Sequence, residues 1–170
     1  VLTTLNPAGM DTENWQVLGI SAEFAENQKR VIQAFARMNV ITTCTCTPYL
    51  SGNVPHFGEH IAWAESSAVC FANSVIGART NREGGPSALA AALTGVTPEY
   101  GYHLTEMRKP SISVQVNAAL EGTHHFGALG HALGPLFDSK DLQPVPYIRG
   151  IGRASIEDLK SFCASFATYC

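Results

Sequence analysis

Residues 60–89 read HIAWAESSAVCFANSVIGARTNREGGPSAL, a segment in which the apolar pattern changes more than once. The apolar run 60–64 is typical of a buried strand, whereas the run 68–76 is long enough for a helix. A polar, glycine-rich loop occupies 79–86, and a short alanine-rich helix is expected over 87–93. A strand followed by helices of this length predicts an α/β protein.

The same alternation of strand and helix patterns is found on both sides of this segment. Helices expected at 21–38 and 155–166 begin at Ser21 and Ser155, which are good N-capping residues. The fold class is therefore α/β, with a layered sheet and flanking helices. A further helix is expected at 126–136, and strands are expected at 1–4, 40–43, 111–118 and 145–148.

The composition excludes several classes of protein. The chain has 170 residues, 45% of them hydrophobic, and its 11 Lys and Arg against 14 Asp and Glu give a net charge of −3. This apolar content excludes a disordered chain, no run reaches the ~18–20 apolar residues of a membrane span, and the mild acidity argues against nucleic acid as a partner. Charged residues make up only 15%, against about 25% in an average domain, so part of the surface is expected to be buried against another domain or subunit.

The cysteine count and the first residues bear on the cellular compartment. Five cysteines cannot form a complete internal disulfide framework, and residues 1–5 lack the pattern of a signal peptide. We therefore expect a cytoplasmic protein. Because the chain opens in apolar sequence without an initiator methionine, we expect it to be a piece of a longer protein.

The turn between the expected strand and helix carries Glu65, Ser66 and Ser67. Free N–H groups and the positive partial charge of a helix N-terminus attract anions. Ser66 or Ser67 can cap the helix, which leaves the second hydroxyl and the carboxylate for another role. Arg79 follows the same helix, and a guanidinium recognises carboxylate or phosphate groups through paired hydrogen bonds, although a solvated loop is the alternative.

Cys44 and Cys46 lie where an expected strand enters a loop rich in proline and glycine. The spacing alone favours small buried core cysteines, and thiolates at such a position would also suit a metal, an iron–sulfur cluster or a nucleophile. One loop cannot supply three cluster ligands, so a cluster would need cysteines from elsewhere.

Two further motifs have the wrong context or are incomplete. The segment 56–60, HFGEH, matches the H-x-x-E-H zinc pattern, but Pro55 and Gly58 argue against the helix on which that pattern depends. The segment 150–155, GIGRAS, resembles a dinucleotide-binding loop without its third glycine. A turn that presents histidines and a glycine turn that leads into a helix are the expected structures.

Taken together, several runs resemble the catalytic domain of the aconitase X family. They are TTLNP at 3–7, CTPY at 46–49, GEHIAW at 58–63, ESSAV at 65–69 and the long run ANSVIGARTNREGGPSAL at 72–89. The match is dense from residue 2 to about residue 103 and looser beyond it. The resemblance implies an iron–sulfur-dependent hydro-lyase of the aconitase superfamily.

Two branches of this family differ in substrate. One dehydrates cis-3-hydroxy-L-proline, and the other converts (R)-5-phosphomevalonate to trans-anhydromevalonate 5-phosphate in the mevalonate pathway. The hydroxyproline branch carries Asn at the position of Ser67 and lacks the run REGGP at 82–86. The resemblance therefore implies the phosphomevalonate branch, with a small anionic hydroxy acid as substrate and hydroxyproline dehydration as the alternative.

Carried over to matching positions, the family pattern implies roles for individual residues. Cys46 is expected to be one of three cysteine ligands of the cluster. Glu65 or Ser66 is the candidate base, with a base from another segment as the alternative. The expected substrate-binding residues are Asn6, Pro7, Ser67 and Arg79.

The resemblance also implies that the chain is incomplete. Residues 1–170 are expected to be part of one catalytic domain, and the family's N-terminal segment, C-terminal half and small swivelling domain or subunit lie outside them. Cys163 and Cys170 do not match the family's other ligand motifs, so the fragment alone is expected to be inactive. A non-catalytic interaction domain that keeps the fold without the cluster is the alternative from a different class, and a zinc hydrolase at 56–60 is a third.

Overall fold

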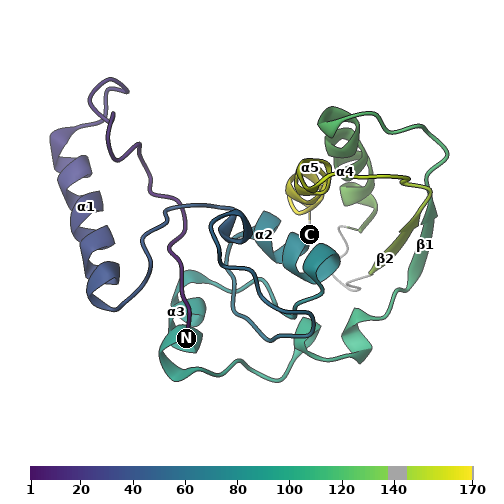
Figure 1. Cartoon of the computed structure of the whole chain (residues 1–170), viewed down its shortest axis with the longest axis horizontal. Coiled ribbons are helices and arrows are strands. Elements are labelled where there is room, and N and C mark those ends of the chain that lie inside the picture. The colour runs from purple at the N-terminus through teal and green to yellow at the C-terminus, as the bar shows by residue number, and fades with distance from the viewer. Residues whose placement is uncertain (138–144, 170) are drawn as a thin grey trace. The chain divides into compact units, whose positions relative to one another are not determined.

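The computed structural model describes residues 1–137 and 145–169, which contain helices and one small parallel sheet. The chain divides into two compact units, Val1–Val54 and Pro55–Cys170, and each is described separately. The α/β class is confirmed. The elements are α1 (Ala22–Arg37), α2 (Ser66–Phe71), α3 (Gly85–Thr94), β1 (Ile112–Gln115), α4 (Thr123–Phe137), β2 (Pro146–Arg149) and α5 (Ile156–Phe166) (Figure 1).

The first unit contains α1 and two extended segments. Ser21 caps α1 as expected, and its hydroxyl accepts a hydrogen bond from the backbone N–H of Phe24. The strands expected at 1–4 and 40–43 are reduced to one parallel bridge between Thr4 and Ile41. The pairing ends because Cys44 adopts a positive φ of 48°, which interrupts the extended conformation.

The second unit begins with the segment that contains the expected strand 60–64. Only His60 pairs there, in a parallel bridge with Arg79, so the strand prediction is wrong. Farther along, the N–H of Trp63 donates to the side-chain oxygen of Thr80 at 3.2 Å, where a continuing sheet would use a backbone carbonyl. A side chain thus takes the place of the next strand.

Helix α2 starts earlier than the apolar pattern indicated. Glu65 is the N-cap residue, its carbonyl accepts from the N–H of Val69, and its side chain makes no capping hydrogen bond. Ser66 is already helical, so the prediction that Ser66 or Ser67 caps this helix is wrong. The helix continues into a π-helical turn, Ala72–Ile76, which ends at Gly77 in the left-handed conformation.

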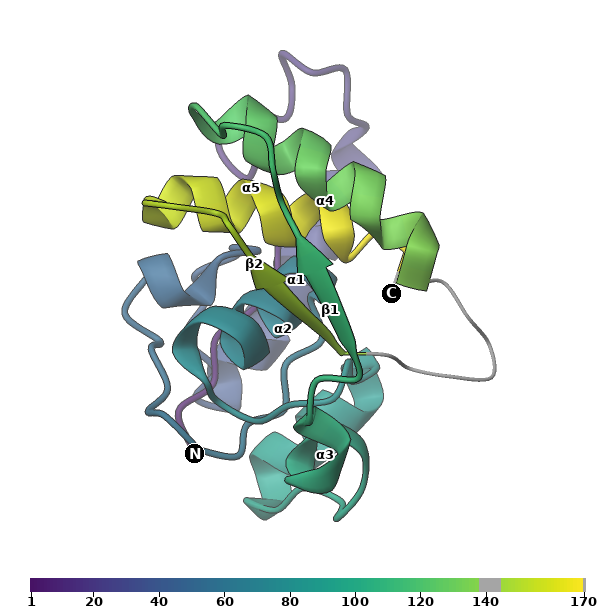
Figure 2. The same cartoon turned by 90° about the vertical axis from the view of Figure 1, so that its right-hand side faces the viewer.

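The C-terminal part of the second unit packs two helices beside the sheet. Strands β1 and β2 pair in parallel, with Ile112 opposite Pro146, and both were predicted, β1 from its alternating pattern. Figure 2 shows α4 and α5 next to each other and beside the strands. Leu133, Phe137 and Phe166 form the buried cluster between these helices.

Helices α4 and α5 approach so closely that a glycine is required at the contact. Replacing Gly130 with alanine is expected to lower the free energy of unfolding by about 1–3 kcal/mol, which urea unfolding measures. A Cβ at this position would lie 2.5 Å from the carbonyl oxygen of Phe162 and 3.0 Å from the backbone nitrogen of Phe166. Gly127→Ala is the matched control, because its Cβ would meet only side-chain oxygens, those of Ser161 at 2.9 Å and Ser165 at 3.6 Å, and no backbone atom. Equal stability of the two variants would contradict the close contact.

Among the helices of the described segments, none is both long and apolar enough to cross a bilayer.

Candidate functional site

The loop that carries Cys46 lies in the first unit, next to the segment that carries Asn6. The carbonyl of Leu5 accepts hydrogen bonds from the N–H of Thr45 at 3.1 Å and from the hydroxyl of Thr43 at 3.3 Å. Leu5 and Thr45 are thus hydrogen-bonded to each other. Asn6 directly follows Leu5, and Cys46 directly follows Thr45. The structure brings these two predicted site residues into neighbouring segments, and Pro7 follows Asn6 directly.

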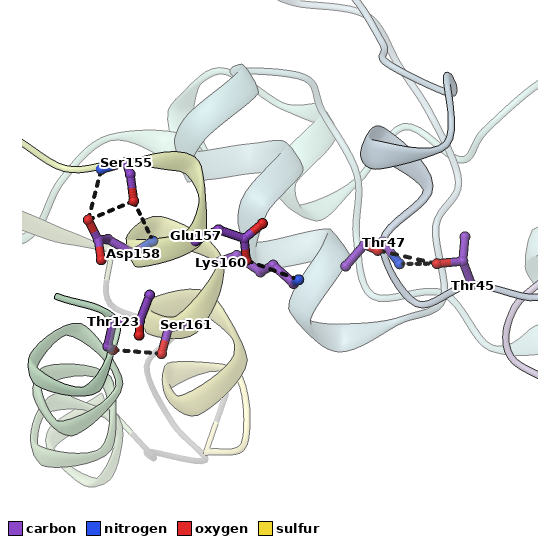
Figure 3. Close-up of polar contacts among 8 residues, drawn as sticks. All are labelled: Thr45, Thr47, Thr123, Ser155, Glu157, Asp158, Lys160 and Ser161. Atoms are coloured by element: carbon purple, nitrogen blue, oxygen red, sulfur yellow. Dashed lines mark hydrogen bonds and ion pairs between the residues drawn. The ribbon is translucent and has the colours of Figure 1, made fainter.

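Cys46 itself is exposed and is held between two hydrogen-bonded threonines. Thr45 and Thr47 flank it in the sequence, and Figure 3 shows their contact: the two hydroxyls are 3.2 Å apart, and the N–H of Thr47 donates to the Thr45 hydroxyl. Cys46 and both predicted substrate residues of this unit, Asn6 and Pro7, are exposed. An exposed thiol on a braced loop fits an iron ligand, and the expectation of a buried core cysteine is wrong for Cys46.

The described residues do not form a complete metal site by themselves. They contain no group of three or more His, Cys, Asp or Glu side chains placed to hold a metal ion. Cys70 on α2 and the buried Cys163 on α5 hydrogen-bond to each other, which lowers the pKa of the Cys70 thiol and raises that of Cys163. Cys170 lies outside the described residues. Cys46 thus fits as one ligand of a set that the described residues do not complete.

The second unit contains a cavity of about 880 Å³ between α2, the loops around residues 82 and 102, β2 and the end of α5. Apolar side chains from α2 and α5 cover part of its wall, and hydroxyl, amide and guanidinium groups cover the rest. The polar side chains on its wall include Ser66, Asn73, Ser74, Asn81, Arg82 and Arg108. Two guanidinium groups on one cavity wall favour an anionic ligand.

Asn73 fixes the polar wall of this cavity. Its amide donates to the carbonyls of Val69 and Thr80, and its side-chain oxygen accepts from Arg108. Arg108 also donates to the Asn73 carbonyl at 3.2 Å and to the Tyr102 carbonyl at 3.4 Å. Burial, together with the charge of Arg79, lowers the pKa of Arg108. The acceptors in these bonds are neutral carbonyl and amide oxygens. They therefore do not neutralise the positive charge of the Arg108 guanidinium.

Next to the residues of the cavity wall, Arg79 is connected to the histidine pair His60 and His103. Arg79 donates to the carbonyl of His103 at 2.7 Å and to the hydroxyl of Thr105 at 3.0 Å. The rings of His60 and His103 are stacked at 5.1 Å, with their Nδ1 atoms 2.9 Å apart. Arg79 therefore holds the loop that follows Tyr102.

His103 is held in its neutral form by its surroundings. Burial is the main cause that lowers its pKa, and the electrostatic influence of His60 lowers it further. Glu83 raises the pKa, whereas Arg79 and Arg108 lower it. His103 is only 3% exposed and Glu83 only 8% exposed, so both belong to the interior.

This burial predicts the pH dependence of stability. A folded-state pKa below the unfolded value of about 6.5 means that the unfolded chain binds the proton first. The stability contributed by neutral His103 should therefore be complete above about pH 6.5 and fall as the pH decreases toward the folded-state pKa. Urea midpoints measured between neutral and mildly acidic pH should fall less steeply for His103→Gln than for the wild type. His124→Gln, at an exposed histidine, should keep the wild-type slope; a His103→Gln slope equal to it would contradict the assignment.

The predicted site residues of the second unit occupy different places. Ser66 lines the cavity, whereas Glu65, Ser67 and Arg79 are half-buried and are not among the residues of its wall. The residues that sequence reasoning did not assign are Asn73, Arg82, Glu83, His103 and Arg108. The first three lie in the run 72–89, so the motif contained a signal for them. His103 and Arg108 lie in no motif, and only folding brings them to the site.

The two incomplete motifs have the structures expected for them. The segment 56–60 is a turn in which the Glu59 carboxylate accepts from the N–H of His56. At the N-terminus of α5, Ser155 and Asp158 cap each other's backbone N–H groups, as Figure 3 shows. The N–H groups of Ser155 and Asp158 are therefore already hydrogen-bonded within the chain.

The fold and this site define an α/β protein with a cavity suited to an anion and an exposed cysteine suited to iron. A family model described as the aconitase X first domain matches residues 1–106. The chain belongs to the aconitase X family.

Three similar proteins illustrate this membership. The phosphomevalonate dehydratase large subunit of Methanothermobacter thermautotrophicus is 54% identical over 99% of the chain and 41% of its own length. The cis-3-hydroxy-L-proline dehydratase of Hypocrea jecorina is 35% identical over 98% of the chain and 28% of its own length. The crystal structure of holo-form aconitase X from Thermococcus kodakaraensis matches with a TM-score of 0.83 at 46% identity, over 98% of this chain and 40% of that one. The chain thus spans about two fifths of the first relative and of the solved structure.

Proposed function

We propose that the chain is part of a hydro-lyase that dehydrates (R)-5-phosphomevalonate to trans-anhydromevalonate 5-phosphate. The observation that carries the proposal is the cavity in which Arg82 and Arg108 face a common space. Identity supports the same substrate: 54% and 51% to two large subunits of phosphomevalonate dehydratases, against 35% to a cis-3-hydroxy-L-proline dehydratase.

The cavity suits a substrate with two anionic ends. Phosphomevalonate carries a carboxylate and a phosphate, and guanidinium groups bind both through charge-assisted hydrogen bonds. Arg82 and Arg108 would take one of these ends. Hydroxyproline carries only one anionic group and a cationic amine, which two guanidiniums disfavour.

The reaction removes a proton next to the carboxylate and a hydroxyl from the neighbouring carbon. Ser66 is the proposed polar group at the reacting part of the substrate, because it is the first residue of α2 and lies on the cavity wall. Glu65 is the proposed base or its partner, and Ser67 a substrate contact. Asn6 and Pro7 are assigned to the substrate site on the family pattern. Arg79 keeps a proposed substrate-binding role, with two of its five N–H groups committed to the loop at 103–105.

We assign Cys46 as one of three cysteine ligands of an iron–sulfur cluster. When bound, such a cluster supplies a Lewis acid that makes the substrate hydroxyl a better leaving group. The chain's own contribution is a thiol held in place by Thr45 and Thr47. The remaining ligands are assigned to parts of the complete enzyme beyond the described residues.

The complete enzyme is proposed to contain residues 1–170 as part of one catalytic domain, together with a small swivelling domain or subunit. The name of the methanogen relative, a large subunit, supports such a partner. Exposed apolar side chains are consistent with it, since Val17 is 87% and Phe57 88% exposed. Free thiols at Cys44 and Cys46 favour a reducing compartment, so a cytoplasmic location is proposed.

A substrate comparison tests the proposal. The complete protein, produced with its small subunit and purified without oxygen, should be brown and should convert (R)-5-phosphomevalonate to an α,β-unsaturated acid, which proton NMR detects. Activity on cis-3-hydroxy-L-proline instead would support the alternative substrate. A preparation that contains no iron and acts on neither compound would favour a non-catalytic interaction domain.

A further inference from the structure

Two buried polar atoms behind the cavity lack a hydrogen-bond partner among the residues that the structure describes. They are Oε1 of Glu83 and Nε2 of His103. A buried polar atom without a hydrogen-bond partner lowers the stability of the folded state, so both atoms need a physical explanation. The proposed function does not yet use either residue.

The segments that carry the two side chains are joined by hydrogen bonds. The Asn81 amide donates to the carbonyl of Tyr100 at 3.2 Å, and the N–H of Tyr102 donates to the Asn81 side-chain oxygen at 2.8 Å. Glu83 is two residues beyond Asn81, and His103 directly follows Tyr102. The negative charge of Glu83 is near enough to raise the pKa of His103.

The hydrogen-bonding capacities of the two orphaned atoms are complementary. The Nδ1 atoms of His60 and His103 share one proton across 2.9 Å. When His60 donates this proton, a neutral His103 carries its own proton on Nε2 and becomes a donor there. Glu83 Oε1 is an acceptor. A water molecule between the two atoms would satisfy both.

The histidine pair is joined directly to the loop that forms one wall of the cavity, because His103 comes next after Tyr102. Tyr100, Gly101 and Tyr102 line the cavity, and the loop continues into His103, which His60 and Arg79 hold. A proton added to His103 would place a new positive charge beside Arg79 and Arg108. The state of the histidine pair therefore bears on the geometry of the arginine-lined wall.

We propose that Glu83, His103 and His60 are positioning residues that hold the loop at 100–105, and through it the cationic wall of the cavity, in the arrangement that binds the anionic substrate. In this proposal the carboxylate and the histidine pair act on the loop at 100–105 without touching the substrate. This inference rests on the proposed function for its effect on binding, whereas the coupling between Glu83 and His103 can be measured without turnover.

The first experiment measures the coupling directly. Histidine ring resonances of the complete protein, labelled with ¹⁵N and assigned by substitution, report the titration of His103. Glu83→Gln removes a charge that raises the pKa of His103, so its midpoint should move to lower pH. His60→Gln removes the ring whose electrostatic influence lowers it, so the midpoint should move to higher pH. An unchanged midpoint in both variants would overturn the inference. If one variant does not fold, the other alone decides, because each has its own predicted direction.

The second experiment measures the effect on binding in the enzyme assembled with its small subunit and cluster. Glu83→Gln should raise KM for (R)-5-phosphomevalonate about tenfold, the effect of losing one such hydrogen bond, while kcat changes much less. The acid limb of the kcat/KM profile should also move with the titration of His103. Glu106→Gln is the matched control, since Glu106 is exposed and pairs only with Lys109 among the described residues. An equal fall in kcat with unchanged KM would overturn a positioning role. Inactivity of the wild type on this substrate would instead refute the proposed function, with the titration still deciding the coupling.

Discussion

Replacing Cys46 with serine should remove the iron–sulfur cluster from the complete enzyme and lower kcat about a thousandfold or more, the loss expected when a Lewis acid worth several kcal/mol is removed. Serine keeps the size of the side chain but supplies a poor ligand for iron. Because Cys46 is exposed, the fold should tolerate the change. Iron content and the visible absorption spectrum of the anaerobically purified protein measure the loss.

Cys44→Ser is the matched control for this experiment. Cys44 lies two residues away in the same loop and is half-buried. Its replacement should leave the iron content and the spectrum close to those of the wild type. Equal iron content in Cys46→Ser and the wild type would contradict the assignment of Cys46 as a ligand.

Replacing Arg82 with alanine should raise KM for (R)-5-phosphomevalonate roughly ten- to a hundredfold, because a hydrogen bond to a charged group contributes about 1.5–3 kcal/mol. Arg82 lines the cavity and is exposed, and the thermal midpoint of the variant checks that the fold is retained. Arg82→Lys should recover part of the affinity, since it keeps the charge but loses the paired donors. Steady-state kinetics with the assembled enzyme measures both effects.

The control for Arg82 is Arg153→Ala. Arg153 is exposed and is not a residue of the cavity wall. A KM equal to the wild-type value in Arg82→Ala, or raised equally in Arg153→Ala, would show that the cavity is not the anion site. In that case the second unit would need another binding surface for the substrate.

Features that depend on neighbouring residues were predicted from the sequence. Ser21 and Ser155 cap their helices because a capping bond joins residues only three apart. Strand β1 was predicted from the alternation of apolar residues, and β2 as a short strand. The same reasoning was wrong for the strand expected at 60–64, because strand formation also needs a partner, and there a threonine side chain occupies that place.

The residues of the candidate site also fall into two groups: those that the sequence indicated and those that only the folded chain brings together. Motif resemblance selected Cys46 and Ser66, and the structure finds the first exposed and the second on the cavity wall. It also selected Arg79, whose guanidinium bonds to the loop at 103–105. Nothing local to His103 or Arg108 marks them, since their importance comes from contacts with residues 24 to 43 positions away.

Family membership and the caps at Ser21 and Ser155 are properties of short runs of residues, so the order of the amino acids was enough to find them. The cavity, the lowered pKa of His103 and the Glu83 oxygen that has no hydrogen-bond partner among the described residues arise from burial. Burial depends on which distant segments exclude water from a side chain, and the folded chain alone defines that.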